Sequence, residues 1–239
     1  MISAGSLKTI SNKQQTTELN VRREYIQHLF LSYFYQQPNT HEVFFKGGTA
    51  LRIIYSSPRF SEDLDFSSSS SDIKQIEDAV LDTLQEVERE GIHTEITESK
   101  ITSGGYLAII LFDLVDQRIS LHLEISLREG EKKGELTTIA SDFIPPYTIM
   151  SLSTEQLVGE KIQALLTRQK PRDFYDLYFI LRANVLTQKE RAILPKVLQT
   201  LKKSDIQFES ELKQFLPKSH WAVIRDFKSI LERELQRFI

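Results

Sequence analysis

The stretch FFKGGTALRIIYSSPRFSEDLDFSS, residues 44–68, decides the fold. It opens with a short apolar run, breaks at Gly47-Gly48, continues with the apolar residues of a helix and ends in an acidic alternation. This order predicts a strand, a glycine turn and a helix, followed by an extended segment. Since successive side chains of an extended backbone point to opposite faces, Asp63 and Asp65 share one face while their apolar neighbours enter the core.

Two carboxylates that close repel each other unless a cation lies between them. Mg²⁺, or Mn²⁺ in its place, prefers such hard oxygen ligands and completes its shell with water and substrate phosphate. Glu124 would add a third carboxylate, because it lies on the polar face of a predicted strand with strict alternation over residues 119–127. The sequence thus predicts metal ligands at Asp63, Asp65 and Glu124, although such alternation also marks an ordinary half-exposed strand.

The glycine pair Gly47-Gly48 is expected to receive a phosphate group. Without side chains, the start of the helix leaves its backbone N–H groups open, and the helix dipole favours negative charge there. Thr49 would add a hydroxyl and Arg59 a cation. The alternative is that the glycines form only a turn and the Asp-x-Asp pair only a solvated strand edge.

Lys161 occupies an unusual position on a predicted helix that begins with a capping-box spacing from Ser153 to Gln156. The lysine is expected to point toward the packed side, because apolar residues lie three and four positions away on the same face. It would then either bind phosphate or extend its ammonium group to the surface. Those apolar residues are Leu157, Val158, Ala164 and Leu165.

The next predicted helix begins at Pro171-Arg172-Asp173, where proline is tolerated and an aspartate can cap free N–H groups. Asp173 is therefore either a cap or a catalytic acid. Arg172 and Asp176 are placed to form a local ion pair. An apolar stripe at helical spacing, which predicts a packed scaffold, comprises Phe174, Leu177, Tyr178 and Leu181.

The order of the expected elements indicates an α+β protein. After a helix over 17–35 and the stretch above, a helix begins near Asp72, and three strands follow at 92–97, 106–115 and 119–127, with a turn at Asp116-Gln117. Pro145-Pro146 is expected to end the sheet region, and everything from Ser153 is helical. We therefore predict an α/β domain over residues 1–150, with a mixed sheet, and an all-α domain over residues 151–239.

Composition is that of a soluble globular protein, with 239 residues, 40% hydrophobic and 26% charged. With no cysteine, the chain has no disulfide or zinc-thiolate site. Because no stretch has the apolar length of a signal peptide or a membrane span, we expect a cytoplasmic protein. A net charge of −3 is not the global footprint of a nucleic-acid binder, so RNA would be bound by local patches such as Lys202-Lys203 or residues 168–172.

Four motifs resemble the signatures of the AbiEii/AbiGii toxin family, which includes the MenT-like toxins, within the DNA polymerase β-like nucleotidyltransferase superfamily. They are KGGTAL (46–51), RFSEDLDF (59–66), Glu160-Lys161 and RDFYDL (172–177). The resemblance spans about residues 43–181 and implies a polymerase β-like core followed by a helical bundle. The chain departs from the shorter Gly-Ser form of the first motif by having Gly-Gly-Thr, which bears on nucleotide preference.

The resemblance also implies roles for individual residues. Asp63 and Asp65 would bind the catalytic metal, Lys161 would hold the triphosphate, and Asp173 would be a further catalytic acid. The nucleotide-binding set taken from the motifs is Lys46, Gly47, Gly48, Thr49, Arg59, Ser61 and Lys161.

Family members are bacterial toxins that transfer a nucleotide, in studied cases to the acceptor end of tRNA, and are countered by an antitoxin. We therefore expect an NTP substrate, Mg²⁺ or Mn²⁺, a tRNA or other RNA acceptor, a cognate antitoxin and no membrane association. Two alternatives stay open. The acceptor is a small molecule or a protein, or the chain is a catalytically inactive nucleotide-binding interaction module.

Overall fold

In the computed structural model, which describes residues 1–127 and 130–239, tertiary contacts divide the chain into two compact units. The first, here called the sheet unit, comprises residues 1–56 and 60–152. The second, the helical unit, comprises residues 153–239 together with the short segment Ser57–Arg59.

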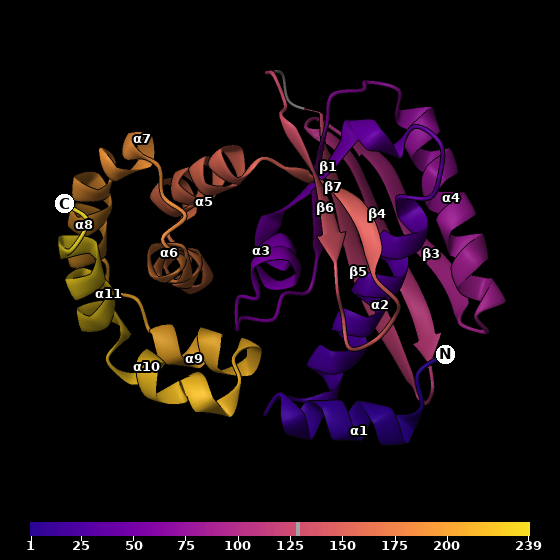
Figure 1. Cartoon of the computed structure of the whole chain (residues 1–239), viewed down its shortest axis with the longest axis horizontal. Helices are drawn as coiled ribbons and strands as arrows, with labels where there is room; N and C mark the ends of the chain where they lie inside the picture. Colours follow the sequence, from indigo (N-terminus) through magenta and orange to yellow (C-terminus); the bar gives the residue numbers. More distant parts are fainter. Residues whose placement is uncertain (128–129) are drawn as a thin grey trace. The chain divides into compact units, whose positions relative to one another are not determined.

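The sheet unit is built on a seven-stranded mixed sheet with the order β3-β4-β5-β2-β1-β7-β6 (Figure 1). The pairs β2–β5 and β1–β7 are parallel and the other four pairs are antiparallel. The strands are β1 (Val43–Lys46), β2 (Leu64–Ser68), β3 (His93–Thr102), β4 (Gly105–Leu114), β5 (Gln117–Ser126), β6 (Gly134–Ile139) and β7 (Tyr147–Leu152).

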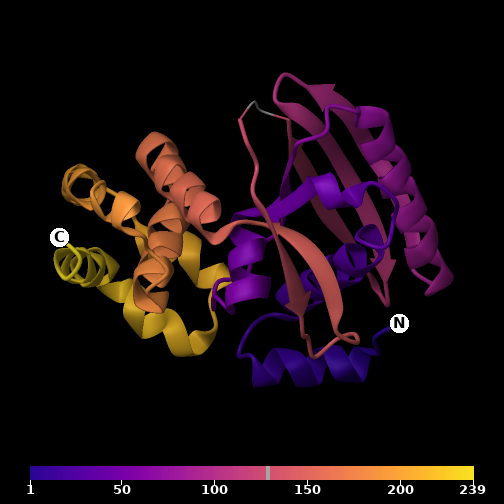
Figure 2. The same cartoon turned by 45° about the horizontal axis from the view of Figure 1, so that its top comes forward.

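The helices of this unit are α1 (Ala4–Lys13), α2 (Glu18–Phe34), the 3₁₀ turn η1 (Thr40–Glu42), α3 (Gly47–Tyr55) and α4 (Ile73–Arg89). Three of them begin at side-chain caps, where Ser3 accepts a hydrogen bond from the Ser6 N–H, Thr17 from the Asn20 N–H and Asp72 from the Gln75 N–H. Helices α2 and α4 pack on each other, and α4 runs alongside β3 (Figure 2).

The core of the sheet unit lies between the sheet and helices α2 and α4. Phe34 of α2 and Phe45 of β1 each lie 5.5 Å, ring centroid to ring centroid, from Phe66 of β2. All three rings are fully buried. The burial of Phe66 directs the odd-numbered neighbour Asp65 to the opposite face of the sheet, as the alternation of an extended strand requires.

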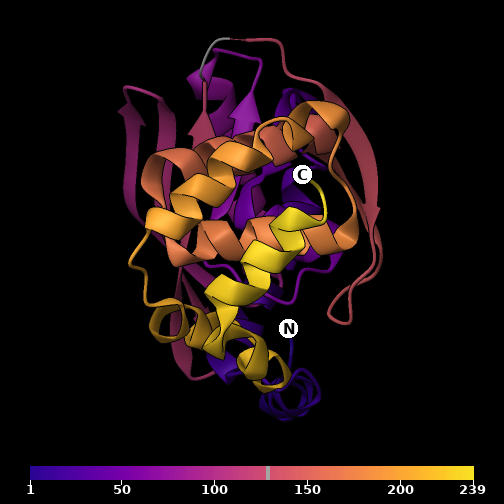
Figure 3. The same cartoon turned by 90° about the vertical axis from the view of Figure 1, so that its left-hand side faces the viewer.

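The helical unit contains α5 (Thr154–Arg168), α6 (Pro171–Ala183), α7 (Gln188–Arg191), α8 (Leu194–Lys203), α9 (Phe208–Leu212), η2 (Lys213–Phe215), η3 (Lys218–His220), α10 (Trp221–Arg225) and α11 (Phe227–Gln236) (Figure 3). Its core is aromatic. Phe208 lies 5.6 Å from Phe174 and 4.9 Å from Phe227, and Phe227 stacks on Tyr175 at 5.7 Å. The predicted cap is present, since Ser153 accepts from the Gln156 N–H.

The predicted α+β class, with a mixed sheet and a helical C-terminal part, is confirmed. Two local predictions were wrong. The β4–β5 turn lies at Val115-Asp116, with Val115 in the left-handed region at φ 59°, one residue earlier than expected. Pro145-Pro146 does not end the sheet, because β7 follows the prolines and pairs with both β1 and β6.

Candidate active site

Three charged side chains lie in one row across adjacent strands of the sheet. Lys46 of β1 is the register partner of Asp65 of β2, and Asp65 is in turn the partner of Glu124 of β5. Directly paired residues of neighbouring strands project from the same face, so these three share the face opposite the aromatic core. The prediction that the polar residues of β5 lie opposite its apolar ones is confirmed, because Ile119, Leu121, Leu123 and Ile125 are buried while Glu124 is exposed.

The side chain of Asp65 packs directly against Gly47, the first residue of α3. Gly47 has φ +85°, in the left-handed region that favours glycine. A methyl group at this position would lie 2.7 Å from Cβ of Asp65 and nearer still to its carboxylate oxygen Oδ2. The absence of a side chain at Gly47 therefore makes room for the carboxylate at the start of the helix.

A second contact holds the backbone next to Asp65. Thr49, fully buried in α3, donates its hydroxyl to the backbone carbonyl of Asp63 at 2.5 Å. Two residues earlier in the chain, Gln27 of α2 donates to the carbonyl of Ser61 at 2.9 Å. This arrangement favours a positioning role for Thr49 over the predicted contact with phosphate, and it fixes the approach of the chain to both aspartates.

The donor set suits a hard divalent cation. Asp63 and Asp65 are half-buried and Glu124 is exposed, so carboxylate oxygens are accessible beside a glycine that leaves space around them. Among residues 1–127 and 130–239, however, no three acidic, histidine or cysteine side chains stand close enough together to form a ready metal site. The metal role of Asp63, Asp65 and Glu124 accordingly stays a prediction.

In the helical unit, two predicted site residues converge on Asp176. The Lys161 ammonium lies 2.7 Å from Asp176 Oδ2, and Arg59 binds both carboxylate oxygens through Nε at 2.7 Å and Nη2 at 3.0 Å. Burial by itself would raise the pKa of Asp176, but the charges of Arg59 and Lys161 and their hydrogen bonds outweigh it and lower this pKa to about 2. Asp176 is therefore ionised and neutralised inside the unit.

This cluster changes how two sequence predictions are interpreted. Lys161 points toward the packed side of its helix, as expected, and is only 8% exposed. Arg59 is 3% exposed, which favours a structural ion pair over the predicted contact with a nucleotide. The suggested Arg172–Asp176 pair was wrong, since Asp176 binds Arg59 and Lys161 and Arg172 instead lies 3.9 Å from Glu211.

Asp173 performs the capping role that the sequence left open. Its carboxylate accepts a hydrogen bond from the Lys170 N–H at 3.1 Å, at the start of α6. It also receives three hydrogen bonds from the guanidinium of Arg168, the shortest at 2.7 Å. Since the residue is 1% exposed, the catalytic role of Asp173 stays a prediction with a structural alternative in place.

Asp176 was missed as a member of this group. The signal available in the sequence was a single acidic residue inside the apolar stretch FYDLYFIL, where an unpaired charge would be costly. Sequence alone offered no way to choose its partners, because Arg59 lies 117 positions away.

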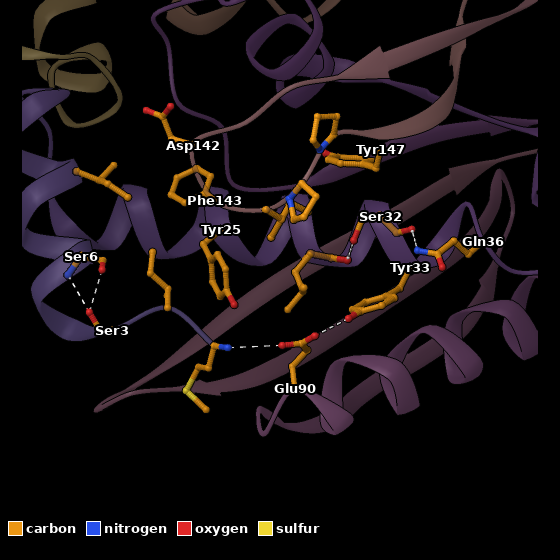
Figure 4. Close-up of a pocket in the computed structure, with 17 residues that line it drawn as sticks. Ser3, Ser6, Tyr25, Ser32, Tyr33, Gln36, Glu90, Asp142, Phe143 and Tyr147 are labelled. Carbon is orange, nitrogen blue, oxygen red and sulfur yellow. Dashed lines mark hydrogen bonds and ion pairs between the residues drawn. The ribbon is translucent and has the colours of Figure 1, made fainter.

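A separate cavity of about 670 Å³ lies in the sheet unit, between α1, α2 and the segment that leads into β7 (Figure 4). Its lining includes the aromatic residues Tyr25, Phe143 and Tyr147. Within it Tyr33 donates to Glu90 Oε1 at 2.7 Å. None of the predicted site residues belongs to its lining, so the cavity is distinct from the carboxylate row.

Two solved structures share this architecture. The crystal structure of JHP933 from Helicobacter pylori superposes with a TM-score of 0.61 at 21% identity, covering 93% of this chain and 95% of that one. The "putative nucleotidyltransferase from H. pylori" gives a TM-score of 0.58 at 19% identity, with coverage of 93% and 99%. The chain thus shares its overall fold with these two proteins.

The family follows from a second comparison. The family model for the nucleotidyl transferase AbiEii toxin of a type IV toxin–antitoxin system matches residues 29–238. The chain belongs to this family, whose toxins are paired with an antitoxin. A search of curated proteins found no match. Within the described residues, no helix is both long enough and apolar enough to cross a membrane.

Proposed function

We propose that the protein transfers a nucleoside monophosphate from an NTP to an acceptor hydroxyl on RNA, most simply the 3′ end of tRNA, in the cytoplasm. The single observation that carries this is the position of Asp65, which lies against Gly47 and in one row with Lys46 and Glu124. Carboxylates at the start of a helix would combine a cation site with a phosphate site. That pairing is what phosphoryl chemistry on an NTP requires.

In the proposed reaction, the acceptor oxygen forms a bond to the α-phosphorus, the bond to pyrophosphate breaks, and the hydroxyl proton is released. Asp63 and Asp65, with Glu124 beside them, would hold Mg²⁺ or Mn²⁺. When bound, a pair of such cations supplies charge for the entering and leaving oxygens.

The chain's own groups do the rest. The first N–H groups of α3 and the ammonium of Lys46 receive phosphate oxygens, while Thr49 and Gln27 keep the Asp63 and Ser61 backbone in place. Lys161 as a triphosphate ligand and Asp173 as a further acid remain part of the proposal. Because Lys161 also neutralises Asp176, Lys161→Met tests the first of these roles only on protein shown to be folded, where an unchanged KM for NTP would contradict it.

The test supplies purified protein, Mg²⁺ and each of the four NTPs labelled at the α-phosphate to separate pools of total RNA, protein and small molecules. We expect label in the RNA pool, concentrated in tRNA, with one NTP preferred. Asp65→Ala should remove the labelling, and equal labelling by that variant would contradict the proposal.

The same experiment separates the alternatives. Label in the protein or small-molecule pool alone would assign a different acceptor. Nucleotide bound in every pool without any transfer would indicate an inactive interaction module. An adjoining reading frame with a winged-helix antitoxin pattern would support the toxin role independently.

A further inference from the structure

The modest net charge of the chain conceals a division between its units. The helical unit has 17 Lys and Arg against 11 Asp and Glu, a net charge of +6. The sheet unit has 13 against 22, a net charge of −9. A unit with an excess of cations attracts a polyanion, even though the whole chain is slightly acidic.

Within the helical unit, basic side chains gather around the only tryptophan of the chain. Lys213 Nζ lies 4.6 Å from the centroid of the Trp221 ring, and the ring N–H donates to the Leu216 carbonyl at 3.2 Å. Lys218 and Arg225 lie three positions before and four positions after Trp221 on the continuous η3–α10 segment, which places them on the same side. We call these four residues, Lys213, Lys218, Trp221 and Arg225, the Trp221 face.

Of the three cations of this face, Lys213 lies 3.5 Å from Glu209, and the other two lack such a partner in the part of the chain that the structure describes. Lys218 and Arg225 are exposed, and within the described residues neither forms an ion pair. Trp221 is half-buried, so part of its ring is accessible. On the other side of α10, Ile224 is buried and anchors the segment to the core. The fold therefore presents these charges without using them.

The patches suggested by the sequence differ from this face in part. Lys202 lies 3.1 Å from Glu232, Arg168 binds Asp173 and Arg172 lies near Glu211. These three charges are compensated by neighbours, whereas Lys170 and Lys203 of the same patches are exposed and, like Lys218 and Arg225, form no ion pair within the described residues. What distinguishes the Trp221 face is that its unpaired cations flank an aromatic ring. The Trp221 face is thus the better candidate for a polyanion.

We propose that the Trp221 face binds the acceptor RNA, with Lys213, Lys218 and Arg225 on backbone phosphates and the exposed part of the Trp221 ring against a base. This rests on the proposed function in that the acceptor is RNA. Lysine and arginine neutralise phosphates and release counterions. An aromatic ring adds a stacking surface that an acidic protein could not use, which favours RNA over an acidic polypeptide.

The experiment uses the full-length protein without NTP or Mg²⁺, so that binding is measured apart from transfer. Since Trp221 is the only tryptophan, intrinsic tryptophan fluorescence reports on this face alone. Labelled tRNA is titrated at several salt concentrations while fluorescence anisotropy and tryptophan emission are recorded. The variant is Lys218→Glu with Arg225→Glu, and the control is Lys8→Glu with Lys74→Glu, two exposed lysines of the sheet unit.

We expect tRNA to quench the Trp221 emission. The Lys218/Arg225 variant should bind at least about 10-fold more weakly near 0.1 M salt, and its slope of log Kd against log salt should fall by about 1.5, the value for two lost phosphate contacts. The control should bind like the wild type, and all three proteins should melt at the same temperature.

Three results would overturn the inference: no binding of tRNA by the wild type, an unchanged salt slope in the Lys218/Arg225 variant, or equal binding of polyglutamate. The proposed function fails separately. If wild-type protein labels tRNA but the variant has the same KM for tRNA, only the binding face is wrong. If the protein binds tRNA on this face and labels no RNA, only the reaction is wrong.

Discussion

The two units use acidic side chains in opposite ways. In the sheet unit, the half-buried Asp65 and the exposed Glu124 lie side by side on neighbouring strands, next to a helix that begins with glycine. In the helical unit, Asp176 is 1% exposed and bound by two cations, Arg59 and Lys161. The first arrangement keeps the carboxylates at or near the surface, where a ligand can reach them, and the second buries the carboxylate between two cations.

This difference separates a candidate ligand-binding site from a structural ion-pair cluster. A buried carboxylate with two cations gains little by binding anything else, and its removal leaves those cations uncompensated. In the row of the sheet unit, the half-buried Asp65 lies between Lys46 and the exposed Glu124, and a bound divalent cation would relieve the repulsion between the two carboxylates. We therefore expect substitutions in the helical cluster to reduce stability and substitutions in the sheet row to reduce activity.

The largest effect on stability is expected for Asp176→Asn. It leaves Arg59 and Lys161 buried around a neutral group, which should cost about 3–5 kcal/mol of the free energy of unfolding. Urea denaturation at pH 7 measures the loss. The matched control is Glu211→Gln, whose partner Arg172 is 3.9 Å away and partly exposed, and it should change stability by less than about 1 kcal/mol.

The stability difference between the wild type and Asp176→Asn should depend on pH. Because the pKa of Asp176 is lowered to about 2 in the folded state, from about 4 when unfolded, its stabilisation is fully present above pH 4 and is lost as the pH falls toward 2. The difference in unfolding free energy between wild type and Asp176→Asn should therefore shrink between pH 4 and pH 2. A constant difference over that range would contradict the ion-pair account.

An intermediate effect is expected for Gly47→Ala, which connects stability to the site. The added methyl group would clash with Asp65, and the alanine backbone would have to adopt φ +85°. We therefore expect the free energy of unfolding to fall by about 2 kcal/mol and the transfer rate to fall about 100-fold, because the carboxylate is displaced. Gly104→Ala serves as the control, since nothing lies within 4 Å of its added methyl group. Equal activity of the two variants would show that Asp65 does not depend on Gly47.

The smallest effect is expected for Thr49→Val. The change keeps the shape but removes the donor to the Asp63 carbonyl, leaving a buried acceptor without its partner at a cost of about 1–2 kcal/mol. Thr9→Val, which removes an exposed hydrogen bond to the Gly5 carbonyl, should change stability by less than about 0.5 kcal/mol. Thermal melts of both variants measure the difference, and an unaffected Thr49→Val would mean that this hydrogen bond does not anchor Asp63.

Local periodicity predicted much of the sheet unit. The sequence predicted the strand, glycine turn and helix of residues 43–55, and also the alternation of β5, because each pattern depends on residues a few positions apart. Strand β7 was not, because Pro145-Pro146 suggests an end and the parallel pairing with β1 joins residues about a hundred positions apart. Only the assembled sheet shows that the prolines precede a strand.

The candidate site was likewise predicted only in part from the sequence. The sequence indicated that Asp63 and Asp65 share a face and that Glu124 lies on the polar side of its strand. That Asp65 and Glu124 are direct neighbours follows from the parallel β2–β5 register, which spacing alone does not give. The sequence also did not predict the hydrogen bond from Thr49 to the Asp63 carbonyl or the ion pair between Arg59 and Asp176, because hydroxyl and guanidinium groups can bind many partners.

The most direct test of the central claim is the rate of nucleotide transfer by Asp65→Asn, measured with labelled NTP and tRNA on protein shown by circular dichroism and thermal melting to be folded. We predict a folded protein whose transfer rate is at least about 1,000-fold below that of the wild type, because the carboxylate acts on the reaction and not on the fold. A folded variant that transfers nucleotide at the wild-type rate would contradict it.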